Sequence, residues 1–327
     1  MRQLFARSWQ LVGEASSLRS PGDFRVEDTA GGPVIALRDK SGELRAFHNV
    51  CRHRAGPVAA GSGNCRVLRC RYHGWVYRLD GSLHTAPEIG DVEDFEPGDF
   101  GLVPLEIIEE SGMLFVAAGA EATIGSLAPE NVFARIRERI HPFDPGQLGF
   151  YRRDSYDISC NWKVYVDNYL EGYHLPQVHP ELNKILSYQD YKTEVFDGYS
   201  LQYSDIAQPT DAYSPGQAFY YFIFPNIMLN ILPGRMQTNV VLPLGHDRCR
   251  VVFDYYYEDI ISEAARTKIA EDISFGDLVQ KQDIDICEQV QKGLACGVYE
   301  RGRLSVKREH GVHHFQNMLR DAYSRGA

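Results

Sequence analysis

The chain has 327 residues and a formal net charge of −10; 44% of its residues are hydrophobic and 12% of all residues are aromatic. This length predicts about two domains, and the composition is that of a folded globular protein rather than a disordered one. The acidic balance argues against a nucleic-acid-binding protein, because such proteins normally carry a basic surface.

The N-terminus lacks the charged start, apolar run and small-residue cleavage site of a signal peptide. The most apolar stretch, residues 220–233, contains Pro225, Asn226 and Asn230 and is too short to span a bilayer. Seven scattered cysteines are an odd number, which favours free thiols or metal ligands in a reducing compartment over a disulfide framework. We therefore expect a soluble cytoplasmic protein with neither a nucleic-acid nor a membrane partner.

Residues 1–118 are predicted to form a small all-β domain. An apolar run at 34–37 and an alternating stretch at 44–50 flank a turn of Lys, Ser and Gly. The stretch "WVYRLDGSLHT" (75–85) contains Asp-Gly, a strong hairpin signal, and residues 101–119 predict a third hairpin that turns at Ser-Gly.

Residues 119–327 have a different character. Helical patterns at 161–173 and 262–294 flank strand-like stretches at 218–234, 238–244 and 249–258. Helices and strands segregated in this way predict an α+β second domain.

Two loops between residues 51 and 81 each carry one cysteine and one histidine. Cys51 and His53 form a C-x-H pair, and Cys70 and His73 form a C-x-x-H pair after sixteen intervening residues. Zinc fingers instead group two cysteines and then two histidines, so zinc is the less favoured interpretation. One Cys and one His in each loop suits a Rieske [2Fe–2S] cluster, in which two thiolates bind one iron and two imidazoles bind the other.

A second candidate metal site begins with a pair of histidines. His174 and His179 lie five residues apart in "NWKVYVDNYLEGYHLPQVHPEL", and Pro176 breaks any helix between them. Both imidazoles could then face one metal, although a structural or surface role is the alternative for this pair alone. A carboxylate from elsewhere would complete a 2-His-1-carboxylate site for Fe(II) with open positions for O2.

Asp283 is the predicted third ligand. A helical step of about 100° per residue puts it on one stripe with Phe275, Val279, Cys287, Val290 and Leu294, whereas Asp285 falls on the polar side. A charge on an apolar stripe is costly unless it is paired or binds a metal. A salt bridge or a helix cap is the alternative role for this carboxylate.

With these motifs the chain resembles the catalytic α subunit of Rieske non-haem iron oxygenases over nearly its full length. The shared features are C-x-H-x16-C-x2-H, the N-W-K…D-N-Y-L-E-x-Y-H-x4-H block and the aspartate in a C-terminal helix. The resemblance implies a helix-grip catalytic domain with an antiparallel sheet, and a homotrimer in which each cluster serves a neighbour's iron. It also implies catalytic roles for Asn168 and Glu171, with Glu171 linking the partner subunit's His73 to His174. Most members have Asp at that position, so the glutamate is a departure similar to that of carnitine-type monooxygenases.

The resemblance implies O2 as co-substrate and electrons from NAD(P)H through a separate flavin- and ferredoxin-type reductase, since no G-x-G-x-x-G follows a strand here. Residues 220–245, 287–294 and 299–316 look most like the branch of choline, glycine betaine, stachydrine and carnitine monooxygenases. That branch implies hydroxylation next to a quaternary nitrogen, by N-demethylation or by C–N or alcohol oxidation. One alternative is hydroxylation or dioxygenation of an aromatic ring or acid, or O-demethylation. Another is a redox-only Rieske carrier with an interaction domain, which would have no use for three iron ligands.

An aromatic cage would hold a trimethylammonium group through cation–π contacts. The available rings are Tyr165, Tyr169, Tyr203, Tyr220, Tyr221, Phe222 and Phe224. None is assigned as a ligand, because aromatic residues in a sheet more often belong to the core. Arg235 would pair with a carboxylate in the aromatic-acid alternative, although a surface position is the favoured interpretation of this residue.

Overall fold

The computed structural model of the chain describes residues 2–118, 128–210 and 214–325. These residues form two compact units, one of residues up to 118 with 128–130 and the other from residue 131 onward. The predicted domain boundary at 118/119 falls where the first described range ends. Within the described ranges, every helix is too short or too polar to cross a membrane.

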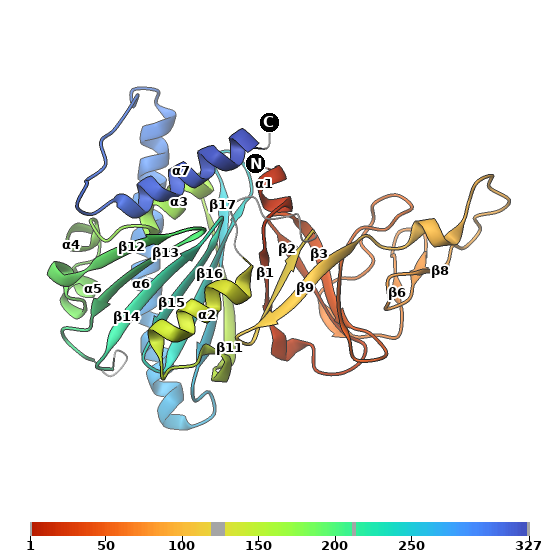
Figure 1. The fold of residues 1–327 in the computed structure, drawn as a ribbon, viewed down its shortest axis with the longest axis horizontal. Helices are drawn as coiled ribbons and strands as arrows, with labels where there is room; N and C mark the ends of the chain where they lie inside the picture. The colour runs from red at the N-terminus through yellow and green to blue at the C-terminus, as the bar shows by residue number, and fades with distance from the viewer. Residues whose placement is uncertain (1, 119–127, 211–213, 326–327) are drawn as a thin grey trace. The chain divides into compact units, whose positions relative to one another are not determined.

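The N-terminal unit consists almost wholly of antiparallel strands (Figure 1). Its elements are α1 (Arg2–Ala6), β1 (Gln10–Glu14), β2 (Asp23–Thr29), β3 (Gly32–Arg38), β4 (Leu44–His48), β5 (Ser62–Asn64), β6 (Leu68–Arg69), β7 (Val76–Tyr77), β8 (Leu83–Thr85), β9 (Pro104–Glu110) and β10 (Met113–Ala117). Seven strands pair in the order β1-β10-β9-β4-β3-β2-β5, and β6-β7-β8 form a smaller sheet. The three predicted hairpins are confirmed as β3–β4, β7–β8 and β9–β10.

The second unit is built on one seven-stranded antiparallel sheet in the order β11-β17-β16-β15-β14-β13-β12. Its strands are β11 (Gly149–Ile158), β12 (Lys192–Phe196), β13 (Tyr199–Asp205), β14 (Gln217–Ile223), β15 (Ile227–Leu232), β16 (Arg235–Pro243) and β17 (Cys249–Tyr257). The helices are α2 (Pro129–Ile140), α3 (Trp162–Tyr169), α4 (Leu175–Val178), α5 (Pro180–Ile185), α6 (Glu263–Ala295) and α7 (His310–Arg325). The predicted α+β class, with an all-β unit followed by a unit with an antiparallel sheet, is confirmed.

Helix α6 lies behind this sheet in Figure 1, and α2 lies in front of it. The α6 helix begins after Ser262, whose hydroxyl accepts the Ala265 N–H at 3.2 Å as an N-cap. The predicted apolar stripe is wrong at its C-terminal end, because Val290 and Leu294 are 44% and 41% exposed. A 33-residue helix is about 50 Å long, whereas a nine-residue strand spans about 30 Å. The helix therefore extends beyond the sheet on which it packs.

Helix α3 ends at Tyr169, four residues earlier than predicted. The Glu171 carboxylate accepts the backbone N–H groups of Tyr173 and His174, the latter at 3.1 Å. In a continued helix those two groups would donate to carbonyls four residues back. The side chain thus replaces the helical hydrogen bonds and turns the chain out of the helix.

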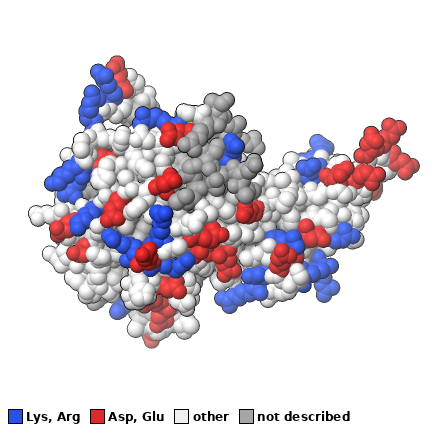
Figure 2. Space-filling view, viewed as in Figure 1, with Lys and Arg blue, Asp and Glu red and all other residues white. Residues whose placement is uncertain are grey.

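On the face drawn in Figure 2, Lys and Arg side chains are interspersed with Asp and Glu on both units. Acidic side chains gather at the tip of the N-terminal unit, where the exposed residues of the 88–96 segment include five carboxylates. The described residues of this face therefore form a mixed surface rather than a basic one.

Candidate metal centres and substrate cavity

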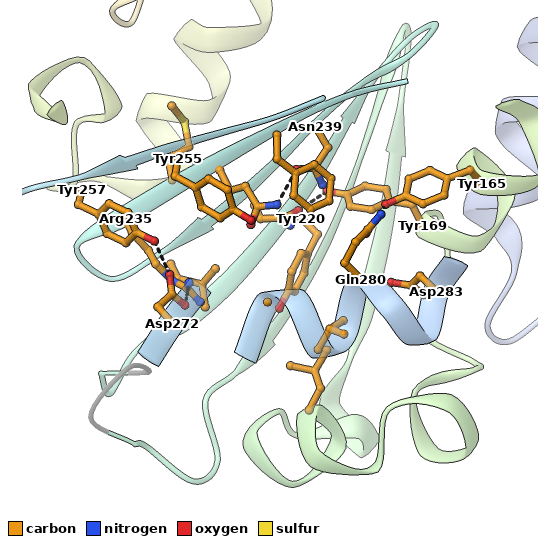
Figure 3. A pocket seen from close by; sticks show the side chains of 18 residues that line it. Tyr165, Tyr169, Tyr220, Arg235, Asn239, Tyr255, Tyr257, Asp272, Gln280 and Asp283 are labelled. Carbon is orange, nitrogen blue, oxygen red and sulfur yellow. Dashed lines mark hydrogen bonds and ion pairs between the residues drawn. The ribbon is translucent and has the colours of Figure 1, made fainter. Parts of the chain in front are cut away.

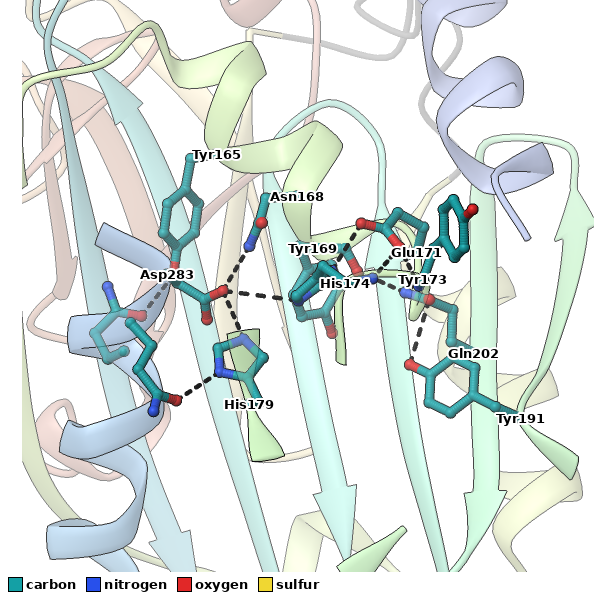
Figure 4. Close-up of polar contacts among 12 residues, drawn as sticks. Tyr165, Asn168, Tyr169, Glu171, Tyr173, His174, His179, Tyr191, Gln202 and Asp283 are labelled. Carbon is teal, nitrogen blue, oxygen red and sulfur yellow. Dashed lines mark hydrogen bonds and ion pairs between the residues drawn. The ribbon is translucent and has the colours of Figure 1, made fainter. Parts of the chain in front are cut away.

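Three predicted iron ligands come together in the second unit (Figure 4). His174 and His179 flank α4, and Asp283 projects from α6. The Asp283 Oδ1 atom lies 3.0 Å from His179 Nε2 and 3.8 Å from His174 Nε2. Ligands at about 2.1 Å from one ion lie no more than about 4.2 Å apart. Both distances are therefore within the reach of a single metal ion.

Each imidazole is oriented by a second side chain. His174 Nδ1 lies 2.7 Å from Glu171 Oε1, and His179 Nδ1 lies 2.7 Å from Gln282 Oε1. With Nδ1 engaged by these oxygens, Nε2 is the ring atom that each histidine has available for a metal, and both Nε2 atoms lie on the side of Asp283. Such partners fix the tautomer and raise the basicity of a metal-binding histidine. Sequence analysis missed Gln282, since a glutamine beside Asp283 has the pattern of a solvated helix residue.

The carboxylate of Asp283 is held from the other side by Asn168, whose Nδ2 donates to Oδ1 at 2.6 Å. Burial is the largest single effect on His179 and lowers its pKa, but the hydrogen bond to Asp283 and the charge of that carboxylate, with Gln282 and Glu171, together raise the pKa above its usual value. Two imidazoles and one carboxylate match the donor set of 2-His-1-carboxylate iron sites. The side chains present therefore fit a divalent ion of that kind.

A cavity of about 110 Å³ extends from Asp283 between α6 and the sheet (Figure 3). Its aromatic lining consists of Tyr165, Tyr169, Tyr220, Phe253, Tyr255 and Tyr257. Tyr165 donates to Gln280 Oε1 at 2.7 Å and Tyr169 donates to Asn230 Oδ1 at 2.8 Å. Burial holds the pKa of both phenols well above its usual value, so both hydroxyls remain protonated donors.

Strand pairing explains why these residues share one face of the sheet. Tyr220 pairs with Asn230, Asn230 with Gln237, and Gln237 with Tyr255, so that one row crosses β14 to β17. Side chains directly opposite each other on paired strands lie on the same face. Tyr221 follows Tyr220 and therefore points to the opposite face.

Three of the seven candidate aromatic residues, Tyr165, Tyr169 and Tyr220, line the cavity. The other four, Tyr203, Tyr221, Phe222 and Phe224, are absent from its lining. Sequence analysis missed the β17 residues Phe253, Tyr255 and Tyr257, although their alternation in "FDYYY" was a usable signal. The expectation of a surface Arg235 is wrong, because its side chain is 12% exposed, lines the cavity and pairs with Asp272.

The four predicted cluster ligands lie in two loops of the N-terminal unit, between β4 and β5 and between β6 and β7. Cys51 and Cys70 are buried, whereas His53 and His73 are exposed, with ring centroids 4.6 Å apart. Within the described ranges, only His174, His179 and Asp283 form a set of three such ligand atoms within 4.8 Å of one another. Two buried thiols and two exposed imidazoles, one of each in either loop, are the donor set of a Rieske [2Fe–2S] cluster.

Packing around the loops supports both pairs. Tyr77 is fully buried, and its hydroxyl lies 3.1 Å from Cys51 Sγ and accepts the Arg52 N–H at 3.0 Å. Trp75 stacks on the His53 ring at 5.0 Å. A Cβ atom at Gly56 would lie 3.2 Å from Cys70 Sγ, so glycine permits the close approach of the two loops.

Comparisons with known proteins identify the family of each unit. The family described as "Ring hydroxylating alpha subunit (catalytic domain)" matches residues 145–325, and the Rieske [2Fe-2S] domain family matches residues 8–96. Chloroplastic choline monooxygenase of Beta vulgaris is 34% identical, covering 98% of this chain and 73% of the relative. The carnitine monooxygenase oxygenase subunit of Acinetobacter pittii is 29% identical, covering 97% of this chain and 88% of the relative.

Solved structures give the same result for the fold. A quaternary ammonium Rieske monooxygenase superposes with a TM-score of 0.84 at 27% identity, covering 97% of this chain and 89% of that one. A naphthalene 1,2-dioxygenase superposes with a TM-score of 0.76 at 17% identity, covering 98% of this chain and 88% of that one. At this identity the similarity shows the shared fold alone. The chain therefore belongs to the Rieske non-haem iron oxygenases, oxidoreductases that combine a Rieske [2Fe–2S] cluster with a mononuclear iron.

Proposed function

We propose that this protein is the oxygenase component that hydroxylates a small quaternary ammonium compound at a carbon near its nitrogen, with O2 and electrons from a separate reductase. The observation that carries the proposal is the small cavity beside Asp283, which has several aromatic residues in its lining. The guanidinium in this lining, that of Arg235, is already paired with Asp272. The similar choline and carnitine monooxygenases support the same substrate class for this chain.

The size and lining of the cavity favour a compact cation. Its volume of about 110 Å³ is below the roughly 150 Å³ of an engineered cavity that binds benzene, which disfavours fused aromatic rings. Aromatic faces attract cations such as trimethylammonium. A substrate carboxylate would have to compete with Asp272 for Arg235, which disfavours aromatic acids.

We infer that the iron is held by His174, His179 and Asp283. The cluster ligands are inferred to be Cys51, His53, Cys70 and His73. When bound at these residues, the iron would supply O2 activation and the cluster would supply one-electron transfer. Around the iron ligands, Glu171 and Gln282 engage the Nδ1 atoms and so direct the imidazole Nε2 atoms toward the iron position, and Asn168 holds the carboxylate. The buried aromatic lining restricts water at the place where the substrate would sit.

A homotrimer would let one subunit's cluster serve a neighbour's iron. His53 and His73 are exposed, as a docking imidazole pair must be. Glu171, bonded to His174, lies two residues from Tyr173, which is 55% exposed.

A single-turnover assay tests the proposal without the reductase. The iron-loaded and chemically reduced protein is mixed with O2 and a set of quaternary amines and aromatic acids, and products are identified by mass spectrometry. We expect an oxidised or demethylated amine, since hydroxylation of an N-methyl group gives a carbinolamine that loses formaldehyde. Product from an aromatic acid alone would contradict the substrate class, and reoxidation of the cluster with no iron bound would favour the redox-only carrier.

Substitution of Gly276 should separate stability from activity. This α6 glycine lines the cavity, and a Cβ atom there would meet nothing within 4 Å. Gly276→Ala should stabilise the helix by about 0.5–1 kcal/mol, while its methyl group occupies cavity space. A methyl-sized change in a substrate pocket is worth about tenfold or more in kcat/KM. Chemical unfolding and steady-state kinetics measure the two effects.

Gly293→Ala is the matched control, since Gly293 lies in the same helix, is exposed and also has open space around its Cβ position. It should give the same gain in stability with no change in kcat/KM. Equal activity of both variants would mean that the substrate does not occupy this cavity.

A further inference from the structure

A second cavity adjoins the one beside Asp283. We call the cavity of about 110 Å³ the inner cavity and its neighbour, of about 350 Å³, the outer cavity. Arg235, Tyr257 and Asp272 are the three residues common to both linings. In Figure 3 these three lie at one end of the drawn pocket and Asp283 lies at the other. The shared residues therefore form the partition between the two cavities.

The partition is a buried charge pair. Arg235 on β16 forms an ion pair with Asp272 on α6, and the Tyr257 hydroxyl on β17 donates to Asp272 Oδ2 at 2.7 Å. The Arg235 and Asp272 side chains are 12% and 3% exposed. Anything that passes between the cavities must separate this pair, and an uncompensated buried charge is strongly unfavourable.

The two cavities differ in their contact with solvent. The outer cavity is lined by exposed residues that include Glu258, Asp259 and Lys268, so carboxylates outnumber amines there. None of the described residues that line the inner cavity is exposed; some are buried, such as Tyr255 and Gln280, and others are partly buried, such as Val279. Asp272 and Asp283 are eleven positions apart in α6, which corresponds to about 16 Å along the helix axis. A path from the outer cavity to Asp283 would thus run along this helix and past Asp272.

We propose that the outer cavity is the substrate entrance and that the Arg235–Asp272 pair is a charge-selective gate into the inner cavity. A quaternary ammonium cation can replace Arg235 as the partner of Asp272 while it passes, so the carboxylate stays compensated. A neutral molecule of the same shape offers no such replacement, and an anion is repelled by the outer carboxylates. This inference rests on the cationic substrate proposed above.

The gate is tested by the rate at which a thiol in the inner cavity is labelled, which requires no turnover. Val279 lines the inner cavity, and Val279→Cys places a thiol there. The tryptic peptide 269–281 contains no other cysteine, so its labelling is read by mass spectrometry without interference. Two thiosulfonate reagents are compared: the trimethylammonioethyl reagent and its neutral 3,3-dimethylbutyl isostere. The measured quantity is the ratio of the cationic to the neutral labelling rate in the holoprotein.

The two single gate variants should move this ratio in opposite directions. Asp272→Asn leaves the Arg235 charge uncompensated in the passage and should lower the ratio about tenfold, the lower end of electrostatic effects on association rates. Arg235→Gln leaves the Asp272 carboxylate and should raise the ratio by a similar factor. The double variant carries no uncompensated charge, so it is suited to the test even if a single variant fails to fold. It should label faster with both reagents, at a ratio near the parent value.

Asp254→Asn is the matched control, because Asp254 is 2% exposed, pairs with Arg153 on the same sheet and lines neither cavity. Its ratio should equal that of the parent. An unchanged ratio in both folded single variants, or an equal shift in the control, would overturn the gate, as would unchanged labelling rates in the double variant. Because labelling is independent of catalysis, failure to oxidise any quaternary amine would count against the proposed function alone.

Discussion

Replacing Asp283 with alanine is expected to abolish oxygenase turnover and to remove the mononuclear iron while leaving the [2Fe–2S] cluster in place. Asp283 is the one carboxylate in the three-residue ligand group, and its Oδ1 also accepts the Asn168 amide. Two imidazoles alone would remain, so iron affinity and activity should both fall by more than about 100-fold. Metal analysis gives the iron content, the visible spectrum reports the cluster, and the single-turnover assay gives activity.

The control for this change lies two residues away. Asp285 belongs to the same helix but is exposed, so Asp285→Ala removes the same chemical group from the solvated side. It should keep full iron content and activity. Iron retained at full occupancy in Asp283→Ala, or lost equally in Asp285→Ala, would contradict the assignment of Asp283 as the ligand.

Glu171→Gln is expected to slow turnover by about 10- to 100-fold with both metal centres still filled. The glutamine keeps the size of the side chain and can accept the His174 Nδ1–H, but it lacks the negative charge that Glu171 places 2.7 Å from that atom. An imidazole that loses its carboxylate partner is less basic, and the proposed carboxylate link between subunits would also be lost. The rate of cluster reoxidation after addition of substrate and O2 measures the effect directly.

The conservative change Glu171→Asp should recover part of the rate. It keeps the negative charge, but its side chain is one methylene shorter and lies farther from His174 Nδ1. Glu181→Gln, an exposed carboxylate in the first turn of α5, is the control and should have the rate of the parent. Loss of iron from Glu171→Gln would instead mean that the residue mainly maintains the iron site. An unchanged rate would mean that Glu171 has only a structural role, that of ending helix α3.

The parts of the fold that could be predicted are those governed by neighbours in sequence. Ser111 and Gly112 both have positive φ, 49° and 74°, as a tight hairpin turn requires. A Ser-Gly pair between two apolar stretches predicts such a turn from the local sequence alone. The same is true of α6, which begins one residue after its Ser262 cap. The early end of α3 could not be foreseen, because a folded-back Glu171 side chain takes the place of the helical hydrogen bonds.

The ligands of the candidate iron site could be predicted from the sequence, but one of the residues that orient them could not. The close spacing of His174 and His179 makes the pair visible, and a charge on an apolar stripe makes Asp283 stand out. The partner of His179 was not visible, since Gln282 lies 103 residues away in the chain and has no distinctive pattern. Only packing of α6 against the α4–α5 segment brings these two side chains together.

By itself, then, the sequence determined the two-unit α+β architecture, the family and the residues whose spacing marks the two candidate metal centres, because turns, caps and ligand spacings are local properties of the chain. Tertiary structure alone decided which rings line the cavity, since strand register selects Tyr220 and Tyr255 for one face and sends Tyr221 to the other. It also decided that Arg235 meets Asp272 in a buried pair rather than solvent. Such pairings depend on strand register and on how a helix lies across a sheet, and neither is encoded in any short stretch of residues.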